Sequence, residues 1–155
     1  MKRLYAFDFD GTLALIVPGI IGFLLSLTGK GDLLLNMAED PKTGRLFVTD
    51  DSKAKTTLVF DQHTGKVIKR IDGDALAIKF DASRNEIFIS QRESKKVLRL
   101  DATSYVVKQS WDLTSHPNRV LLSDDGKTLF VTLKTEFNKD YSTKGLDSIA
   151  RIQLD

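Results

Sequence analysis

Few side chains in this 155-residue sequence could carry out covalent chemistry. The chain has no cysteine, which excludes disulfide bonds, thiol nucleophiles and cysteine-ligated zinc. Its two histidines, His63 and His116, lie far apart in the sequence and form no metal-ligand pattern. The remaining candidates for chemistry are carboxylates, and the pair with the most suggestive spacing is Asp8 and Asp10 near the N-terminus.

These two carboxylates belong to the string DFDGT, which follows a short apolar stretch and resembles the first motif of the haloacid dehalogenase-like phosphohydrolases. The resemblance implies that Asp8 attacks a phosphoryl group, while Asp10 protonates the leaving group and then activates water. It also implies a Mg²⁺ ion that bridges carboxylate and phosphate.

The sequence lacks the context that this motif requires. The resemblance implies further α/β units that carry a Ser or Thr, a Lys and an acidic pair, but nothing after residue 33 alternates between strands and amphipathic helices. The acidic pairs Asp50-Asp51 and Asp124-Asp125 occupy expected turns, where solvent contact explains them. A phosphohydrolase is therefore an alternative hypothesis.

Two stretches have the composition of a binding surface. One is the long excursion KTEFNKDYSTKGLD from Lys134 to Asp147, which mixes aromatic and basic residues. The other runs from Thr114 to Arg119 and precedes an expected strand. The binding residues that we predict are Arg92, His116, Asn118, Arg119, Lys134, Phe137, Lys139 and Tyr141. We expect no metal and no cofactor at this site.

The class of ligand stays open at this stage. We expect an unknown ligand or a protein at this position. Aromatic and basic side chains can also stack on and neutralise single-stranded nucleic acid. However, the formal net charge of +2 gives no strong field that would favour a polyanion. An alternative role for the excursion is to cover an open sheet edge.

The secondary-structure elements that position these residues can be predicted from a repeat in the sequence. A tetrapeptide made of apolar residues and a small polar residue recurs at intervals of about 40 residues, as LFVT from Leu46, IFIS from Ile87 and LFVT from Leu129. A turn-forming cluster precedes each copy: DPKTGR, DASRNE and SDDGKT. This period, built from β-formers and tight turns, predicts a β-propeller with one four-stranded sheet per repeat.

The expected strands follow from alternation and turn chemistry. Asp61 and Asp101 occupy equivalent places at strand ends, where we expect each to accept hydrogen bonds from turn amides. The expected strands are 33–38, 45–49, 57–61 and 66–71 in the first repeat, 75–80, 86–90, 96–101 and 105–111 in the second, and 118–123, 128–133 and 148–154 in the third. The third repeat thus lacks a fourth, outer strand.

Residues 33–155 resemble the YVTN-repeat propeller proteins, which are seven-bladed bacterial proteins of the cell envelope. The naming tetrapeptide corresponds to FVTD, FISQ and FVTL, and the segments DPKTGRLFVTD, VFDQHTGKVIKRI and HPNRVLLSDDGKTLFVT carry the rest of the likeness. The resemblance implies a periplasmic or cell-envelope protein that binds or acts as a scaffold and has no catalytic residues.

This sequence departs from that family in the number of repeats. Seven repeats need about 300 residues, whereas three are present here. An open stack of blades leaves apolar end faces uncovered, and such faces promote association. We therefore expect either self-association or additional blades from a longer protein.

The first 32 residues differ in composition from the rest. No charged residue occurs between Gly11 and Gly29, and most residues there are apolar. A transmembrane segment over residues 13–29 is one interpretation, with Met1-Lys2-Arg3 on the cytoplasmic side. A cleavable signal peptide fits poorly, because Asp8 and Asp10 interrupt it and no A-x-A site follows. We favour a third interpretation, in which this leader is foreign to the propeller.

The sequence thus predicts an all-β fold: a partial β-propeller of about three four-stranded antiparallel blades after an apolar N-terminal segment. The expected division is a leader over 1–32 and blades over 33–74, 75–114 and 115–155. The predicted function is that of a non-catalytic cell-envelope binding or scaffold protein, or a C-terminal fragment of one. The alternatives are a Mg²⁺-dependent phosphohydrolase that uses Asp8 and Asp10, and a membrane-anchored interaction module.

Overall fold

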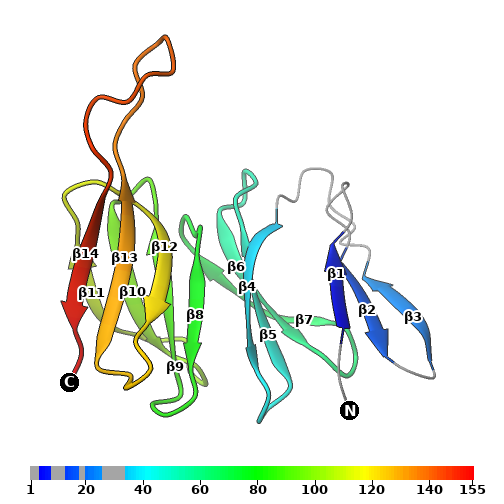
Figure 1. The fold of residues 1–155 in the computed structure, drawn as a ribbon. Coiled ribbons are helices and arrows are strands. Elements are labelled where there is room, and N and C mark those ends of the chain that lie inside the picture. The colour runs from blue at the N-terminus through cyan, green and yellow to red at the C-terminus, as the bar shows by residue number, and fades with distance from the viewer. Residues whose placement is uncertain (1–3, 8–12, 18–19, 26–33) are drawn as a thin grey trace.

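The computed structural model describes residues 4–7, 13–17, 20–25 and 34–155. Every regular element in these ranges is a β-strand, and residues 34–155 form three antiparallel sheets that stand beside one another (Figure 1). The first strands of successive sheets are neighbours, since β8 (Ile78–Asp81) contacts both β4 (Leu34–Asp40) and β12 (His116–Leu122). This arrangement confirms the predicted partial β-propeller, and we call the sheets blades 1, 2 and 3.

Each blade is built from strands that are consecutive in the chain. Blade 1 contains β4, β5 (Arg45–Asp50), β6 (Thr56–Asp61) and β7 (Val67–Asp72), and blade 2 contains β8, β9 (Glu86–Gln91), β10 (Lys96–Asp101) and β11 (Val107–Asp112). Blade 3 contains β12, β13 (Thr128–Lys134) and β14 (Ser148–Gln153). Within the described ranges blade 3 has three strands, as the repeat pattern predicts.

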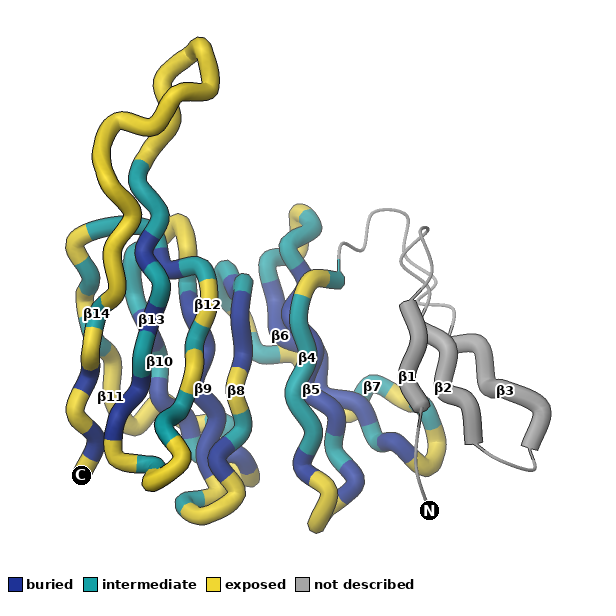
Figure 2. The backbone as a smooth tube through the Cα atoms, in the orientation of Figure 1, coloured by how far each residue is buried: buried dark blue, intermediate teal, exposed yellow. Residues whose placement is uncertain are grey.

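The recurring tetrapeptide lies on the second strand of each blade and packs the blades together. Its phenylalanine faces the following blade, whereas the residues on either side face the preceding one. Phe47 accordingly packs with Ile87 and Ile89 between blades 1 and 2, and Phe88 packs with Leu129 and Val131 between blades 2 and 3. The buried side chains therefore form layers between blades. Figure 2 marks the buried residues in dark blue along the backbone.

The small polar residue that ends the tetrapeptide joins the second strand to the first. The Asn36 amide donates to Thr49 Oγ1 at 3.0 Å, and the Arg119 amide donates to Thr132 Oγ1 at the same distance. In blade 2 the Ala77 amide donates to Ser90 Oγ at 2.9 Å. A short hydroxyl side chain is needed here because it must reach a backbone N–H on the adjacent strand.

The turns after the third strands are closed by carboxylates, as predicted for Asp61 and Asp101. Asp61 Oδ1 accepts from the amides of His63 at 2.9 Å and Thr64 at 2.8 Å. Asp101 Oδ1 accepts from the amides of Thr103 and Ser104 at 2.9 and 2.7 Å. The backbone hydrogen bonds from Thr64 and Ser104 lower the pKa of Asp61 and Asp101 respectively.

The interpretation of residues 13–29 as a membrane-spanning helix does not fit the described part of this run, residues 13–17 and 20–25, which form strands. β1 (Leu4–Phe7), β2 (Leu13–Val17) and β3 (Ile20–Leu25) form an antiparallel sheet in the order β1-β2-β3. Pro18 and Gly19 stand between the last two strands in the sequence, and this pair favours a turn over a continuous helix. In the part of the chain that the structure describes, no helix is long and apolar enough to cross a bilayer.

Candidate binding site on blade 3

The excursion between β13 and β14, which we call the arm (residues 134–147), projects beyond the end of blade 3 (Figure 1). Most of its residues are exposed, as Figure 2 shows. Large apolar side chains lie among them: Phe137 is 53% exposed, Tyr141 87% and Leu146 91%. Solvent contact of this extent for three such residues in one segment is typical of a surface that receives a partner.

Polar contacts hold the base of the arm in place. Lys134 forms an ion pair with Asp147, so the two residues that begin and end the arm are joined directly. The amide of Thr135 donates to Asp147 Oδ1 at 3.1 Å, and its hydroxyl donates to the carbonyl of Gly145 at 3.2 Å. The hydrogen bond from Lys134 is the first cause that lowers the pKa of Asp147.

The middle of the arm forms a short hairpin. The Lys144 amide donates to the carbonyl of Glu136 at 2.8 Å, and the two side chains form an ion pair at 2.6 Å. Phe137 and Thr143 form an antiparallel bridge farther out. At the tip, Tyr141 adopts a φ of +65°, a conformation that few non-glycine residues adopt. The arm is therefore an ordered hairpin that presents Tyr141 at its tip.

His116, at the start of β12, lies between blade 2 and the arm. Its Nδ1 lies 3.0 Å from the carbonyl oxygen of Arg92, and because a carbonyl can only accept, Nδ1 carries the proton. Its Nε2 lies 3.8 Å from Oε1 of Glu136 on the arm. The turn after β9, the first residue of β12 and the arm therefore lie close together.

A cavity of about 460 Å³ opens at the base of the arm. Its lining residues come from β12, β13, the end of the arm and β14: Asn118, Arg119, Thr132, Leu133, Lys134, Asp147, Ser148 and Ile149. Both positive and negative side chains line it, together with the exposed apolar side chain of Ile149. Such a mixture suits a polar organic group or a peptide better than a bare ion.

The structure places the predicted binding residues in one region, but they lie in different parts of it. Asn118, Arg119 and Lys134 line the cavity. Arg92 and His116 contact each other beside the arm, while the arm itself carries Phe137, Lys139 and Tyr141. The sequence reasoning missed Asp147, Ile149 and Leu146. The alternation of Ile149 and Arg151 along the last strand was the signal that could have indicated which residues face outward.

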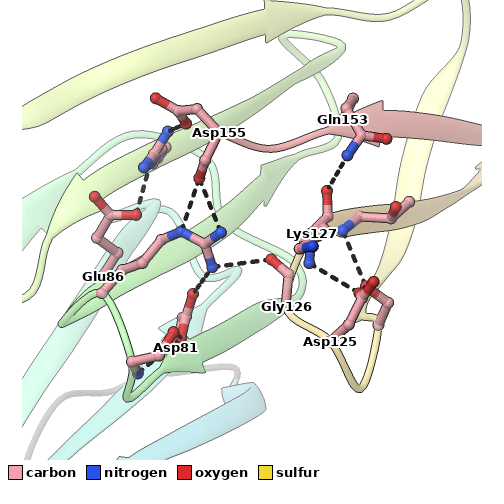
Figure 3. Close-up of polar contacts among 12 residues, drawn as sticks. Asp81, Glu86, Asp125, Gly126, Lys127, Gln153 and Asp155 are labelled. Atoms are coloured by element: carbon pink, nitrogen blue, oxygen red, sulfur yellow. Dashed lines mark hydrogen bonds and ion pairs between the residues drawn. The ribbon is translucent and has the colours of Figure 1, made fainter.

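A second polar cluster, at the opposite end of the blades, joins blade 2 to blade 3 (Figure 3). Arg84 donates to Asp81 Oδ2 at 2.8 Å and to the carbonyl of Gly126 at 2.9 Å. Arg99 donates to the buried carboxylate of Glu86 at 2.6 Å and pairs with Asp155. The hydrogen bond that Arg99 donates to Glu86 is the first cause that raises the pKa of Arg99. These groups are satisfied by one another, which indicates a structural role.

The candidate carboxylates of the N-terminal motif, Asp8 and Asp10, lie outside the described residues. Among the residues that are described, no group of three or more histidine and acidic side chains could hold a metal ion. Asp50 of the pair Asp50-Asp51 accepts hydrogen bonds from Ser52, and Asp125 of the pair Asp124-Asp125 accepts from Ser123 and Lys127. Both carboxylates therefore stabilise turns. Solvent contact, which we expected to explain the acidic pairs, applies to the exposed Asp125 but not to Asp50, which is fully buried.

Comparisons with known proteins agree with the fold. No family model matches the chain. It is 34% identical over 158 residues to the uncharacterized protein YncE of Salmonella typhimurium strain LT2, and 36% identical to the protein of the same name from Escherichia coli K12. Each match covers 99% of this chain but 44% of the relative, so the chain spans less than half the length of these curated relatives.

Solved structures show the same architecture at lower identity. A hydrazine synthase of Kuenenia stuttgartiensis matches with a TM-score of 0.68 and 18% identity, over 96% of this chain and 45% of that chain. Sqt1 of Saccharomyces cerevisiae matches with a TM-score of 0.66 and 13% identity, over 94% and 44%. Apo AztD of Citrobacter koseri gives 0.62 and 16%, over 77% and 34%. Together with the all-β structure, these matches show a β-propeller protein.

The comparisons also bear on the N-terminal segment. Because the matches to YncE cover 99% of this chain, they include nearly all of residues 1–32. This coverage argues against our expectation that the leader is foreign to the propeller. Nothing in these matches supports the phosphohydrolase resemblance of the DFDGT string.

Proposed function

We propose that this chain is a non-catalytic β-propeller protein of the cell envelope, of the YVTN-repeat type, that binds a protein partner through the arm on blade 3. The observation that carries the proposal is the combination of an ordered arm and exposed apolar side chains along it. The Lys134–Asp147 and Lys144–Glu136 ion pairs order the arm, while Phe137, Tyr141 and Leu146 remain in solvent. An ordered segment loses less conformational entropy when it binds.

The charges of the arm favour a protein over single-stranded nucleic acid. Two of its three lysines are paired with carboxylates of the arm itself, so little positive charge is left to neutralise phosphates. Its exposed aromatic side chains are of the type that contributes most to protein interfaces. The cell-envelope location depends on the repeat resemblance alone, and fractionation of the source cells would check it.

A photo-crosslinking experiment tests the proposed site. A photoreactive phenylalanine analogue replaces Tyr141 in one variant and Val106 in a control, because Val106 is 62% exposed but lies on blade 2 away from the arm. We expect an adduct of defined mass from the Tyr141 position in envelope extract and none from the Val106 position. Equal adducts from both positions, or none from Tyr141, would contradict the proposal.

A titration with a labelled oligodeoxythymidine separates the two ligand classes. If the arm binds protein, the anisotropy of the oligonucleotide changes little at physiological salt, and Lys139→Ala has no effect on it. Tight, salt-dependent binding that is lost in Lys139→Ala would show that the arm binds single-stranded nucleic acid, and this result would contradict a protein partner.

A further inference from the structure

The imidazole of His116 lies where blade 2, blade 3 and the arm meet. His116 begins β12 of blade 3, its Nδ1 donates to the carbonyl of Arg92 in blade 2, and its Nε2 faces Glu136 of the arm. The side chain of His116 is 24% exposed, so water and protons reach it. Blade 2 therefore contributes a backbone acceptor to this contact, and the arm contributes a carboxylate.

The tautomer of the ring decides which nitrogen can gain a proton. Because Nδ1 of the neutral ring carries its hydrogen toward the Arg92 carbonyl, Nε2 is left with a free lone pair. Nε2 and the Glu136 carboxylate are then both hydrogen-bond acceptors, and their separation of 3.8 Å is too long for a hydrogen bond. A proton on Nε2 changes this contact of two acceptors into an attraction between an imidazolium and a carboxylate.

The carboxylate of Glu136 can bind two cations at once. Its Oε2 pairs with Lys144 Nζ at 2.6 Å, whereas the oxygen that faces His116 is Oε1. An ionised carboxylate has about four lone-pair sites, so the pair with Lys144 leaves room for a second donor. The hydrogen bond from Lys144 also lowers the pKa of Glu136, and this side chain therefore stays ionised at pH 5.5.

Charged side chains belong to every element around this contact: Arg92, Glu93 and Lys95 in the turn after β9, Lys134 at the end of β13, and Lys144 and Asp147 on the arm. Lys134, which opposes His116 in the strand register, is paired with Asp147. Lysine, arginine and ionised carboxylates keep their charge between pH 5.5 and 7.5, whereas an imidazole ordinarily gains a proton near pH 6.5. His116 is thus the group of this set that changes charge in that range.

We propose that His116 is a pH-dependent switch that joins the arm to blade 2 in mild acid. Uptake of a proton at Nε2 forms an ion pair with Glu136, while Nδ1 still donates to the carbonyl of Arg92. The charged ring then connects the turn after β9 to the arm. When the ring is neutral, the arm is held by the contacts of its own base.

This inference concerns how the arm is held and not what the arm binds. It goes beyond the proposed function, and either can fail without the other. If both are correct, the exposed side chains of the arm lose less conformational entropy on binding in mild acid than at higher pH.

Hydrogen exchange of the arm tests the switch on the full chain. The reporter is the backbone amide of Lys144, which donates to the Glu136 carbonyl at 2.8 Å, a bond that side-chain substitution retains. NMR measures its protection factor, corrected for intrinsic exchange, at pH 5.5 and 7.5 in the wild type, His116→Gln, Glu136→Gln and the double variant. We expect a coupling between the two positions of about 1.5- to 5-fold in protection at pH 5.5, the range of exposed ion pairs, and none at pH 7.5.

Two further variants serve as controls. His63→Gln removes the other histidine of the chain, which lies in the turn after β6, and should leave the gain in acid unchanged. Lys144→Gln removes the ion pair at Oε2 and lowers protection at both pH values, but retains the gain in acid. His116→Gln also loses the bond to Arg92 at both pH values, so comparison of the two values separates that structural loss from the titration.

The outcomes that contradict the switch are distinct. Equal protection of the wild-type arm at both pH values, or a gain in acid that persists in His116→Gln, would overturn it. A coupling of the same size at both pH values would also overturn it, because such a contact does not depend on the proton. The crosslink from Tyr141 is scored separately and tests the proposed function alone.

Discussion

At the scale of single residues, several carboxylates of the described residues accept hydrogen bonds within turns or between blades. Asp81 is an example: its carboxylate accepts from the amide and hydroxyl of Ser83 and from Arg84 Nη1, at 2.9, 2.7 and 2.8 Å. Burial alone would raise the pKa of Asp81, but the hydrogen bonds from Ser83 and Arg84 outweigh it and lower that pKa. The turn after β8 therefore depends on the ionised carboxylate.

Replacement of Asp81 by Asn tests this dependence. We expect the free energy of unfolding to fall by about 1–3 kcal/mol near neutral pH, because charge-assisted hydrogen bonds are lost. The folded pKa lies below the unfolded value of about 3.9, so this contribution is complete above pH 5 and disappears as the pH falls through the folded pKa. Urea unfolding of both proteins across this range measures it.

The control for this experiment is Asp124→Asn. Asp124 is exposed in a nearby turn, and its replacement is expected to change the free energy of unfolding by less than about 0.5 kcal/mol near neutral pH. A loss for Asp81→Asn that stays constant down to pH 2 would show that the carboxylate charge does not contribute.

At the scale of secondary-structure elements, the hydroxyl that ends each tetrapeptide joins strands within and between blades. Thr49 is fully buried and serves both purposes, since it accepts from the Asn36 amide and donates to the Leu76 carbonyl. Thr132 is partly exposed and accepts from the Arg119 amide. The same residue type in the same repeat position thus has different surroundings.

Replacement of each threonine by valine tests whether the two hydroxyl groups contribute differently to stability. We expect Thr49→Val to lower the free energy of unfolding by about 1–3 kcal/mol, because the partly buried Asn36 amide and the Leu76 carbonyl both lose their partner. Thr132→Val should cost clearly less, because water can reach the Arg119 amide. Thermal unfolding followed by circular dichroism compares the two variants. Equal losses of unfolding free energy in both would contradict this expectation.

The strands of residues 34–155 could be predicted from the sequence because their period, turn residues and alternation all indicate the same structure. The expected strand 96–101 matches β10, and the predicted absence of an outer strand in blade 3 is confirmed for the described residues. The first 32 residues could not be predicted in this way. Their long apolar run hides the alternation of a strand and has the length of a membrane helix.

The candidate site was predictable in composition but not in geometry. Aromatic and basic residues in a long excursion indicated the arm, whereas the sequence could not show that Lys134 and Lys144 are paired with Asp147 and Glu136. Pairs of this kind depend on how a hairpin folds back on itself. The same limit applies to Ile149, because its exposure depends on which side of blade 3 a neighbour covers.

At the scale of the whole molecule, the packing separates into layers between blades and an arm that lies outside them. The arm contributes no residue to the buried clusters of the described chain. Its ends are close together, since Lys144 and Glu136 are joined by a backbone hydrogen bond. The blades should therefore be stable without its outer part.

A variant with a shortened arm tests whether the blades are stable without the outer part of the arm. Replacement of residues 137–143 by Asn-Gly closes the hairpin with a two-residue turn between Glu136 and Lys144. We expect the free energy of unfolding to change by less than about 1 kcal/mol, or roughly 2–4 °C in Tm. Thermal unfolding by circular dichroism measures the change, and a much larger fall would show that the arm is part of the core.

The order of the strands has a consequence for how the chain reaches its fold. In the described sheets every strand pairs with a strand that is next to it in the sequence, so most hydrogen-bonded contacts close short loops. Low contact order favours fast folding even in proteins made of strands alone. A blade can pair its strands as soon as its residues leave the ribosome, and each later blade then condenses on a surface that is already formed.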